Sequence, residues 1–332
     1  MIRRELLGRG RALAVALGCA AVAIAGLPAP ASAADRFPAR PITLVVPFAP
    51  GGNLDVVART IAPALEKALG QSVIVDNRAG AGGAIGASFV ARGEPDGHLL
   101  LVTTPNAVGV LPQMTKTTYR LASFQPIGQM ATTPLVVMVR KQSRFADIGA
   151  LLAEVRSRPG QVSVAHSGPG TTNHIAIFQL ESAANLQFNI IAYKGSGPAL
   201  VDLIGGQVDS MVDQLSSSTT HIQSGALRPL AVMSRERDPA LPGVPTLREA
   251  GIADVDATTA SGLLAPAGTP PAVVEALNAA LRKALADPAV AARLAQLGSP
   301  ARPGSAADWQ AQLQQEEKRA VAMAAAGKLK SD

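Results

Sequence analysis

The chain has 332 residues and a net charge of +6, and only 3% of its residues are aromatic. Four Arg and one Glu lie in residues 1–33, so the rest of the chain has a net charge of only about +3 and holds no Lys/Arg cluster. This weak basicity excludes nucleic acid as an expected partner. The scarcity of aromatic rings argues against a sugar-binding cleft, because such clefts rely on ring stacking.

Residues 1–33 are predicted to be an export signal. Arg3, Arg4, Arg9 and Arg11 precede the apolar stretch 12–27, and residues 31–33 read Ala-Ser-Ala, a small-residue cleavage site. We therefore expect a periplasmic protein cleaved near Ala33. The Arg pair leaves Sec and twin-arginine export both open. Cys19 is the only cysteine of the sequence, and its poor lipobox favours soluble release over a lipoprotein.

Strand and helix patterns alternate along the remaining chain, which predicts an α/β fold with mostly parallel sheets and helices on both faces. Strands are expected at 42–46, 72–75, 99–103, 135–140, 162–165, 189–192, 208–212, 230–233 and 262–265. Helices are expected at 55–69, with a kink at Pro63, and at 84–92, 147–156, 173–184, 198–203 and 214–223, and further helices at 270–286, from 288 and at 305–326.

About 300 residues suffice for two α/β lobes, each a doubly wound sheet. Lobe I is expected to comprise residues 35–136 plus 262–332, and lobe II residues 137–261. The chain would then cross between the lobes twice and form a hinge. Because ligands of such sheets bind outside the carboxyl ends of the strands, the site is expected between the lobes.

The stretch 41–59 carries the central hypothesis. A short apolar strand ends in the pair Gly51-Gly52, and a helical pattern starts near Asp55. The first amides of a helix have no partner inside the helix, and the helix dipole places partial positive charge there. Such a loop can hold a small carboxylate without Arg or Lys, although an ordinary strand-to-helix turn has the same pattern.

Two more loops repeat this arrangement. Residues 165–174 run from a strand through a Gly-rich turn into a helix, and so do residues 193–198. Hydroxyls and amides of the 165–174 loop could hold the opposite end of a dianion. Asp213 ends the next strand, where contact with a ligand and a structural capping role are equally good interpretations.

The sequence does not support three other kinds of site, so no metal or cofactor is expected. The Gly-rich run 80–86 resembles a dinucleotide fingerprint but is separated from its strand and lacks the later acidic residue. The four histidines have no metal-binding spacing. Ser196 lies in Gly-Ser-Gly and not in the Gly-x-Ser-x-Gly of a hydrolase.

Ordered motifs along nearly the whole mature chain resemble those of Bug-type extracytoplasmic solute receptors of tripartite tricarboxylate transporters. The motifs are Pro-Ile-Thr-Leu-Val-Val-Pro-Phe-Ala-Pro-Gly-Gly from Pro41, Asp-Asn-Arg-Ala-Gly-Ala-Gly-Gly from Asp76, Pro-Asp-Gly from Pro95, Tyr-Lys-Gly from Tyr193, Gly-Gly-Gln-Val-Asp from Gly205, Leu-Pro-Gly-Val-Pro-Thr from Leu241 and Ala-Pro-Ala-Gly-Thr-Pro from Ala265.

The resemblance implies a monomeric type II-like periplasmic binding protein that closes two lobes on a small organic carboxylate and delivers it to membrane permease subunits. Mapped onto this chain, the expected ligand-binding residues are Phe48, Ala49, Gly51, Gly52, Asn53, Asp55, Thr103, Thr104, Asn106, Ser167, Gly168, Gly170, Thr171, Thr172, His174, Tyr193, Lys194, Gly195 and Asp213. An exported α/β enzyme and a receptor that feeds a sensor kinase are the alternatives.

Three departures from the family pattern bear on the ligand. Asn53-Leu54 replaces small or hydroxyl residues before Asp55, Ala260 stands where many relatives carry Trp, and Val164-Ala165-His166 replaces Tyr-Ala-Ser. From Leu54 we expect a less polar carboxylate, an aromatic one included. The few titratable groups near the expected pocket favour a binding protein over an enzyme.

Overall fold

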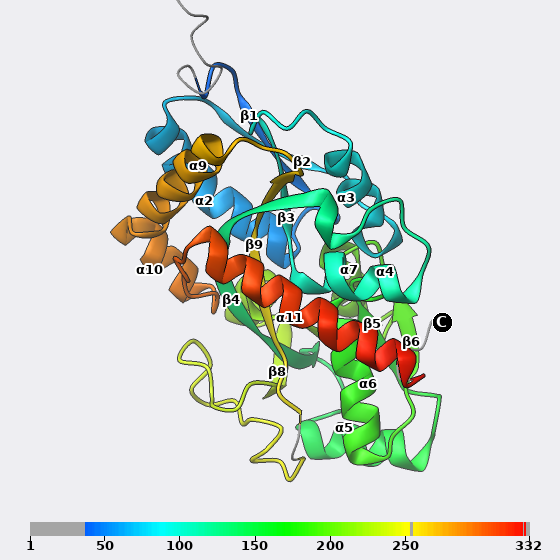
Figure 1. Ribbon diagram of the computed structural model, residues 1–332. Coiled ribbons are helices and arrows are strands. Elements are labelled where there is room, and N and C mark those ends of the chain that lie inside the picture. The colour runs from blue at the N-terminus through cyan, green and yellow to red at the C-terminus, as the bar shows by residue number, and fades with distance from the viewer. Residues whose placement is uncertain (1–36, 253–254, 328, 330–332) are drawn as a thin grey trace, which may run out of the picture. The chain divides into compact units, whose positions relative to one another are not determined.

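A long, curled β-sheet runs through the whole fold (Figure 1). The structure is a computed structural model that describes residues 37–252, 255–327 and 329. The predicted export signal lies outside the described residues. The described residues from Pro38 onward form one compact unit. Among the described residues, no helix is both long and apolar enough to cross a bilayer.

Nine strands join in the order β2-β1-β3-β9-β4-β7-β5-β6, and β8 pairs with β4. The strands are β1 (Ile42–Val46), β2 (Val73–Asn77), β3 (Leu99–Thr103), β4 (Phe124–Arg140), β5 (Ser163–His166), β6 (Asn189–Ala192), β7 (Ser210–Gln214), β8 (Leu227–Val232) and β9 (Thr258–Pro266). The pairs β1–β2, β1–β3, β5–β6 and β5–β7 are parallel. The four pairs that involve β4 or β9 are antiparallel, so the sheet is less parallel than the sequence predicts.

Strand β4 belongs to two parts of the sheet, one in each lobe. Its first part, from Phe124 to Pro134, pairs with β9 and so belongs with β1, β2 and β3. Its second part, from Leu135 to Arg140, pairs with β7 and β8. We call these two groups of strands, with the helices that cover them, the first and second lobes. The sequence predicts only the second part of β4, since Pro126, Gly128 and Pro134 interrupt the strand pattern of the first.

The helices cover the sheet and follow the predicted pattern closely. They are α2 (Asn53–Leu69), α3 (Ala84–Ala91), α4 (Leu111–Met114), α5 (Ile148–Ser157), α6 (Thr172–Ala184), α7 (Ser196–Gly205), α8 (Leu215–Gln223), α9 (Pro271–Leu285), α10 (Pro288–Gln296) and α11 (Ala306–Ala325). A π-helical turn at Asn106–Val110 and α4 after it are not foreseen from the sequence. Helix α2 continues through Pro63 to Leu69.

Local capping explains where several helices begin. The side chains of Asp147, Thr171, Asp287 and Ser305 each accept a hydrogen bond from an amide in the first turn of the helix that follows. Helix α2 has no such side chain, because its N-cap is Gly52. Its first amides are therefore left without a capping group from the residue before it.

Each lobe has its own apolar core. Val45, Leu101 and Leu264 of the first lobe pack with the fully buried Trp309 of α11. Helix α11, red in Figure 1, crosses from β4 to the π-helical turn and so covers this core. In the second lobe Leu135, Val137 and Val139 of β4 pack against α5 and α6, with Met138 on the opposite face.

Candidate functional site

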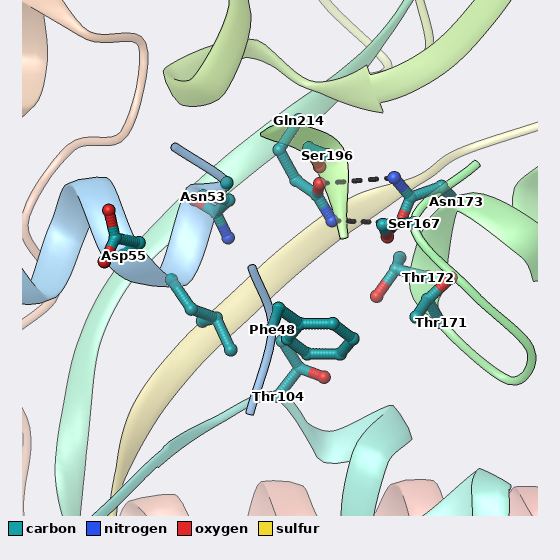
Figure 2. Close-up of a pocket in the computed structure, with 12 residues that line it drawn as sticks. Phe48, Asn53, Asp55, Thr104, Ser167, Thr171, Thr172, Asn173, Ser196 and Gln214 are labelled. Atoms are coloured by element: carbon teal, nitrogen blue, oxygen red, sulfur yellow. Dashed lines mark hydrogen bonds between the residues drawn. The ribbon is translucent and has the colours of Figure 1, made fainter. Parts of the chain in front are cut away.

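A small cavity lies where the carboxyl ends of strands from both lobes meet the N-termini of α2, α6 and α7 (Figure 2). Its volume is about 30 Å³, room for one or two water molecules. It is lined by Phe48, Gly52, Asn53, Leu54, Asp55, Thr104, Ser167, Thr171, Thr172, Asn173, Ser196 and Gln214. These lining residues include no Lys or Arg, so an anion here would be met by amides, hydroxyls and helix N-termini.

The first-lobe wall is the start of α2. Gly52, Asn53 and Leu54 occupy the N-cap and first turn, so their amides lack partners inside the helix. Asn53 is buried, and its Oδ1 accepts hydrogen bonds from Ser216 Oγ at 2.7 Å and Thr133 Oγ1 at 3.2 Å. Its Nδ2 makes no hydrogen bond within the described part of the chain. This wall therefore presents hydrogen-bond donors.

Asp55 holds the α2 loop in shape. Its carboxylate accepts from the amide of Gly51 at 3.0 Å, from Arg59 Nε at 2.9 Å and from Asn77 Nδ2 at 3.0 Å. The Nδ2 of Asn77 also reaches the carbonyl of Phe48 at 3.1 Å. Figure 2 shows the carboxylate of Asp55 turned away from the second-lobe residues. Both oxygens are thus engaged by the protein, and Asp55 positions the loop.

The second-lobe wall carries hydroxyls whose hydrogens are already used within the protein. Ser167 Oγ donates to Asn173 Oδ1, Thr171 Oγ1 to the Gly168 carbonyl, and Ser196 Oγ to Asp213. The N-terminal amides of α6 and α7 open on the same wall. The α6 amides can donate to a second group of a ligand, whereas the hydroxyl oxygens can accept.

Asp213 fixes this wall from behind. It is fully buried, and its carboxylate accepts hydrogen bonds from Ser196 of α7, Ser217 of α8 and Asn173 of α6. Burial raises the pKa of Asp213 to about 6, although these hydrogen bonds oppose the rise. One carboxylate therefore ties together three helices, two of which supply cavity residues.

The lobes meet through closely packed backbone. The amide of Ala49 donates to the carbonyl of Lys194 at 3.1 Å. A Cβ on Gly197 would lie 2.1 Å from the carbonyl oxygen of Pro50, and one on Gly82 would lie 2.3 Å from that of Pro169. Glycine is therefore required on both lobes for this close approach.

Two buried histidines lie under the 165–174 loop. The rings of His166 and His174 stack with centroids 4.4 Å apart. Burial, together with the neighbouring His174, lowers the pKa of His166 to about 3, so this ring is neutral at neutral pH. His174 Nδ1 accepts from the amide of Gly170 at 3.2 Å. The pair shapes the loop from beneath.

The structure brings eight of the residues expected from the sequence to the cavity wall: Phe48, Gly52, Asn53, Asp55, Thr104, Ser167, Thr171 and Thr172. The other eleven do not line it: Ala49, Gly51, Thr103, Asn106, Gly168, Gly170, His174, Tyr193, Lys194, Gly195 and Asp213. Tyr193 instead donates from its hydroxyl to Asp202 at 2.7 Å, and the side chain of Lys194 is exposed. Asn106 accepts from Thr172 Oγ1 at 3.3 Å, a link between the lobes.

Four lining residues are not among these nineteen: Leu54, Asn173, Ser196 and Gln214. Leu54 is the residue from which the sequence predicts a less polar ligand. Asn173 and Ser196 lie in loops that the sequence singles out. Gln214 is missed because the sequence predicts that the strand ends by Asp213 and that a helix begins at residue 214, whereas β7 ends at Gln214. The rule that ligands lie at strand ends would have included Gln214 with the correct boundary.

Comparison with known proteins places the chain in a family. Residues 57–328 match the model of the tripartite tricarboxylate transporter family receptor. Protein BugT of Bordetella pertussis is 40% identical over 284 residues, which are 84% of this chain and 86% of BugT.

Two solved structures are similar over most of both chains. MatC from Rhodopseudomonas palustris, solved with bound malate, has a TM-score of 0.82 and 35% identity, and the match covers 87% of this chain and all of MatC. The R. palustris protein Rpa4515, solved with adipate, has a TM-score of 0.83 and 32% identity over 87% of this chain and 98% of its own. The chain therefore belongs to the receptors of the tripartite tricarboxylate transporter family, which are periplasmic solute-binding proteins of the Bug type and not enzymes.

Proposed function

We propose that this protein captures a small organic carboxylate in the cavity between its lobes and delivers it to the membrane subunits of a tripartite tricarboxylate transporter. The observation that carries the proposal is the wall of donors at the start of α2, with no Lys or Arg among the lining residues. Amides at a helix N-terminus bind a carboxylate by hydrogen bonds and by the helix dipole together. The carboxylates bound by MatC and Rpa4515 support the same ligand class.

In this proposal the two lobes close around the ligand. We place lobe I at residues 35–136 plus 262–332 and lobe II at 137–261. The strand pairing moves these bounds by a few residues, because residues 135–136 pair within the second lobe and residues 258–261 within the first. Because the cavity measures about 30 Å³, a dicarboxylate needs the lobes to move apart before it enters. The crossings near Pro134 and Ala257 are where such a hinge would bend.

Leu54 and Phe48 give the cavity its apolar side. Both line it, and Leu54 is buried. We propose on this basis that the preferred acid has an apolar chain or ring beside its carboxylate. Tighter binding of aspartate than of adipate and benzoate would contradict this preference.

Residues 1–33 serve, in this proposal, as the cleaved signal that takes a monomer to the periplasm. N-terminal sequencing of the exported protein tests cleavage after Ala33, and sedimentation tests the monomer. Uptake of the bound acid by cells with and without the receptor tests delivery to the transporter.

The first experiment is calorimetric titration of the mature protein with malate, adipate, benzoate and aspartate, each beside the amide in which its carboxylates are replaced. We expect at least one acid to bind and its amide to bind much more weakly. At a hundred times its dissociation constant that acid should stabilise the protein by about 2.7 kcal/mol, visible as a rise in Tm. Failure of all four acids to bind overturns the proposal.

A further inference from the structure

The side chain of Asn53 is held in one orientation by hydroxyl groups behind the cavity. Ser216 Oγ lies 2.7 Å from its Oδ1 and Thr133 Oγ1 lies 3.2 Å from the same atom. The 2.7 Å distance is typical of O–H···O and short for N–H···O, which supports oxygen at this position and nitrogen at the other.

The contacts determine which hydroxyl group is the donor in each of these hydrogen bonds. Thr133 Oγ1 lies 2.6 Å from Ser299 Oγ, and either could be the donor. Because Thr133 gives its single hydrogen to Asn53, Ser299 must donate to Thr133. We call Thr133, Ser216 and Ser299 the hydroxyl cluster. All three residues are buried, so water does not compete for their hydrogen bonds.

The opposite atom of Asn53 is left without a partner. Asn53 is only 4% exposed, and its Nδ2 is buried and makes no hydrogen bond within the described residues. Figure 2 shows this nitrogen directed into the space that the lining residues surround. A buried N–H without an acceptor costs free energy comparable to a lost hydrogen bond, so the position favours a ligand that supplies an acceptor.

We infer that Asn53 is a specificity-determining residue, and that the hydroxyl cluster positions it as a donor to a ligand carboxylate oxygen. The inference rests on the proposed function and narrows its ligand class to acids that place a carboxylate oxygen without a hydrogen atom at the start of α2. Ser216 belongs to α8 of the second lobe and Asn53 to α2 of the first. Their hydrogen bond therefore links recognition of the carboxylate to contact between the lobes.

The decisive variant is Asn53→Asp. The new carboxylate has the same shape as the amide and keeps an oxygen for the hydroxyl cluster, but it presents a second oxygen to the cavity. We expect adipate and malate to bind at least 100-fold more weakly at pH 7.5. The mono-amide of adipate should then bind better than adipate, because its NH₂ group can donate to the new carboxylate.

Lower pH supplies an independent readout. Protonation of the carboxylate introduced by Asn53→Asp restores a donor, so the ratio of variant to wild-type affinity for adipate should rise from pH 7.5 to pH 5. Asp55 on α2 and Asp213 behind the second wall are present in both proteins, and the ligand is the same, so their effects on binding cancel in this ratio. Circular dichroism and Tm show that the variant is folded.

Ser216→Ala tests the cluster without a new charge. We expect a five- to tenfold loss of adipate affinity and a smaller preference for adipate over its mono-amide, with rescue by Ser216→Thr. The matched control is Ser218→Ala on the same helix, since Ser218 is equally buried but bonds only to backbone carbonyls.

The outcomes separate the two proposals. If the unchanged protein binds none of malate, adipate, benzoate and aspartate, the proposed function falls and this inference with it. If it binds them and Asn53→Asp keeps the same affinity and preference, the inference alone is overturned.

Discussion

The carboxylate of Asp55 accepts a hydrogen bond at 3.0 Å from the amide of Gly51, four residues before it. The loop before α2 is thus held by its own helix. Asn77 of β2 joins the same carboxylate and the carbonyl of Phe48, so the loop is also fixed to the sheet. This arrangement explains why Asp55 matters to the site although its oxygens are not offered to a ligand.

Asp55→Ala should therefore weaken both the fold and the site. It leaves donors of Gly51 and Asn77 without their acceptor, which we expect to lower the free energy of unfolding by about 1–3 kcal/mol. Adipate affinity should fall about tenfold or more because the α2 amides lose their fixed positions. Urea denaturation and calorimetry measure the two effects.

The control for this change is Asp76→Ala. Asp76 pairs with Arg78 at 2.7 Å on the surface, where a salt bridge contributes about 0–1 kcal/mol. Equal losses in the two variants would show that Asp55 has no special role in the loop.

The close contact of Gly197 with Pro50 leads to a second prediction. In Gly197→Ala the new methyl would lie 2.1 Å from the Pro50 carbonyl oxygen, so the two lobes cannot approach as closely. We expect at least tenfold weaker adipate binding by calorimetry. The Tm of the unliganded protein should also fall, because the backbone of Pro50 must shift and the preference of helices for alanine over glycine offsets only part of that cost.

Gly205→Ala lies on the same helix and provides the comparison, since a Cβ there meets no atom within 4 Å. Its affinity should match that of the unchanged protein. If Gly197→Ala also binds normally, the lobes do not close through this contact.

The sequence predicts the helices and strands well, and it predicts the roles of individual side chains less well. Strand β1 and helices α2 and α6 are found within two residues, because their apolar periods and flanking glycines are local features. Tyr193 and Asp213 are a different case. Whether a polar side chain at a loop faces a ligand or another residue depends on long-range partners such as Asp202 and Ser196. A local pattern does not contain this information.

The first part of β4 escapes sequence analysis for the same reason. Its pairing with β9 joins residues more than a hundred positions apart and tolerates two irregularities in register. Pro126 and Gly128 flank the first of these irregularities, while by local propensity they argue against a strand.

Burial of Asp213 predicts a pH effect on stability. Since its pKa in the folded protein is raised to about 6, the folded state binds more protons than the unfolded state between about pH 4 and 6. The contribution of Asp213 therefore makes the free energy of unfolding fall as pH rises through this window. Asp213→Asn should remove this fall and be relatively more stable above pH 6.

Urea denaturation at pH 4.5, 5.5, 6.5 and 7.5 measures the slope in both proteins. Glu275→Gln, which changes an exposed carboxylate on α9, serves as the control and should keep the slope. A slope that survives in Asp213→Asn would mean that other groups cause the pH dependence.

Leu54 carries the prediction about ligand type. Its side chain lines the cavity next to the amides that would hold the carboxylate. Leu54→Ala should weaken adipate more than malate, because adipate has more methylene groups to bury and each contributes about 0.8 kcal/mol when fully buried. We expect the ratio of the two dissociation constants to change about three- to tenfold.

The control is Leu65→Ala, which removes an equally buried leucine of α2 that does not line the cavity. It therefore matches the loss of stability that follows from removing a buried leucine. If both variants weaken the two acids in the same proportion, Leu54 supports the helix and does not select the ligand.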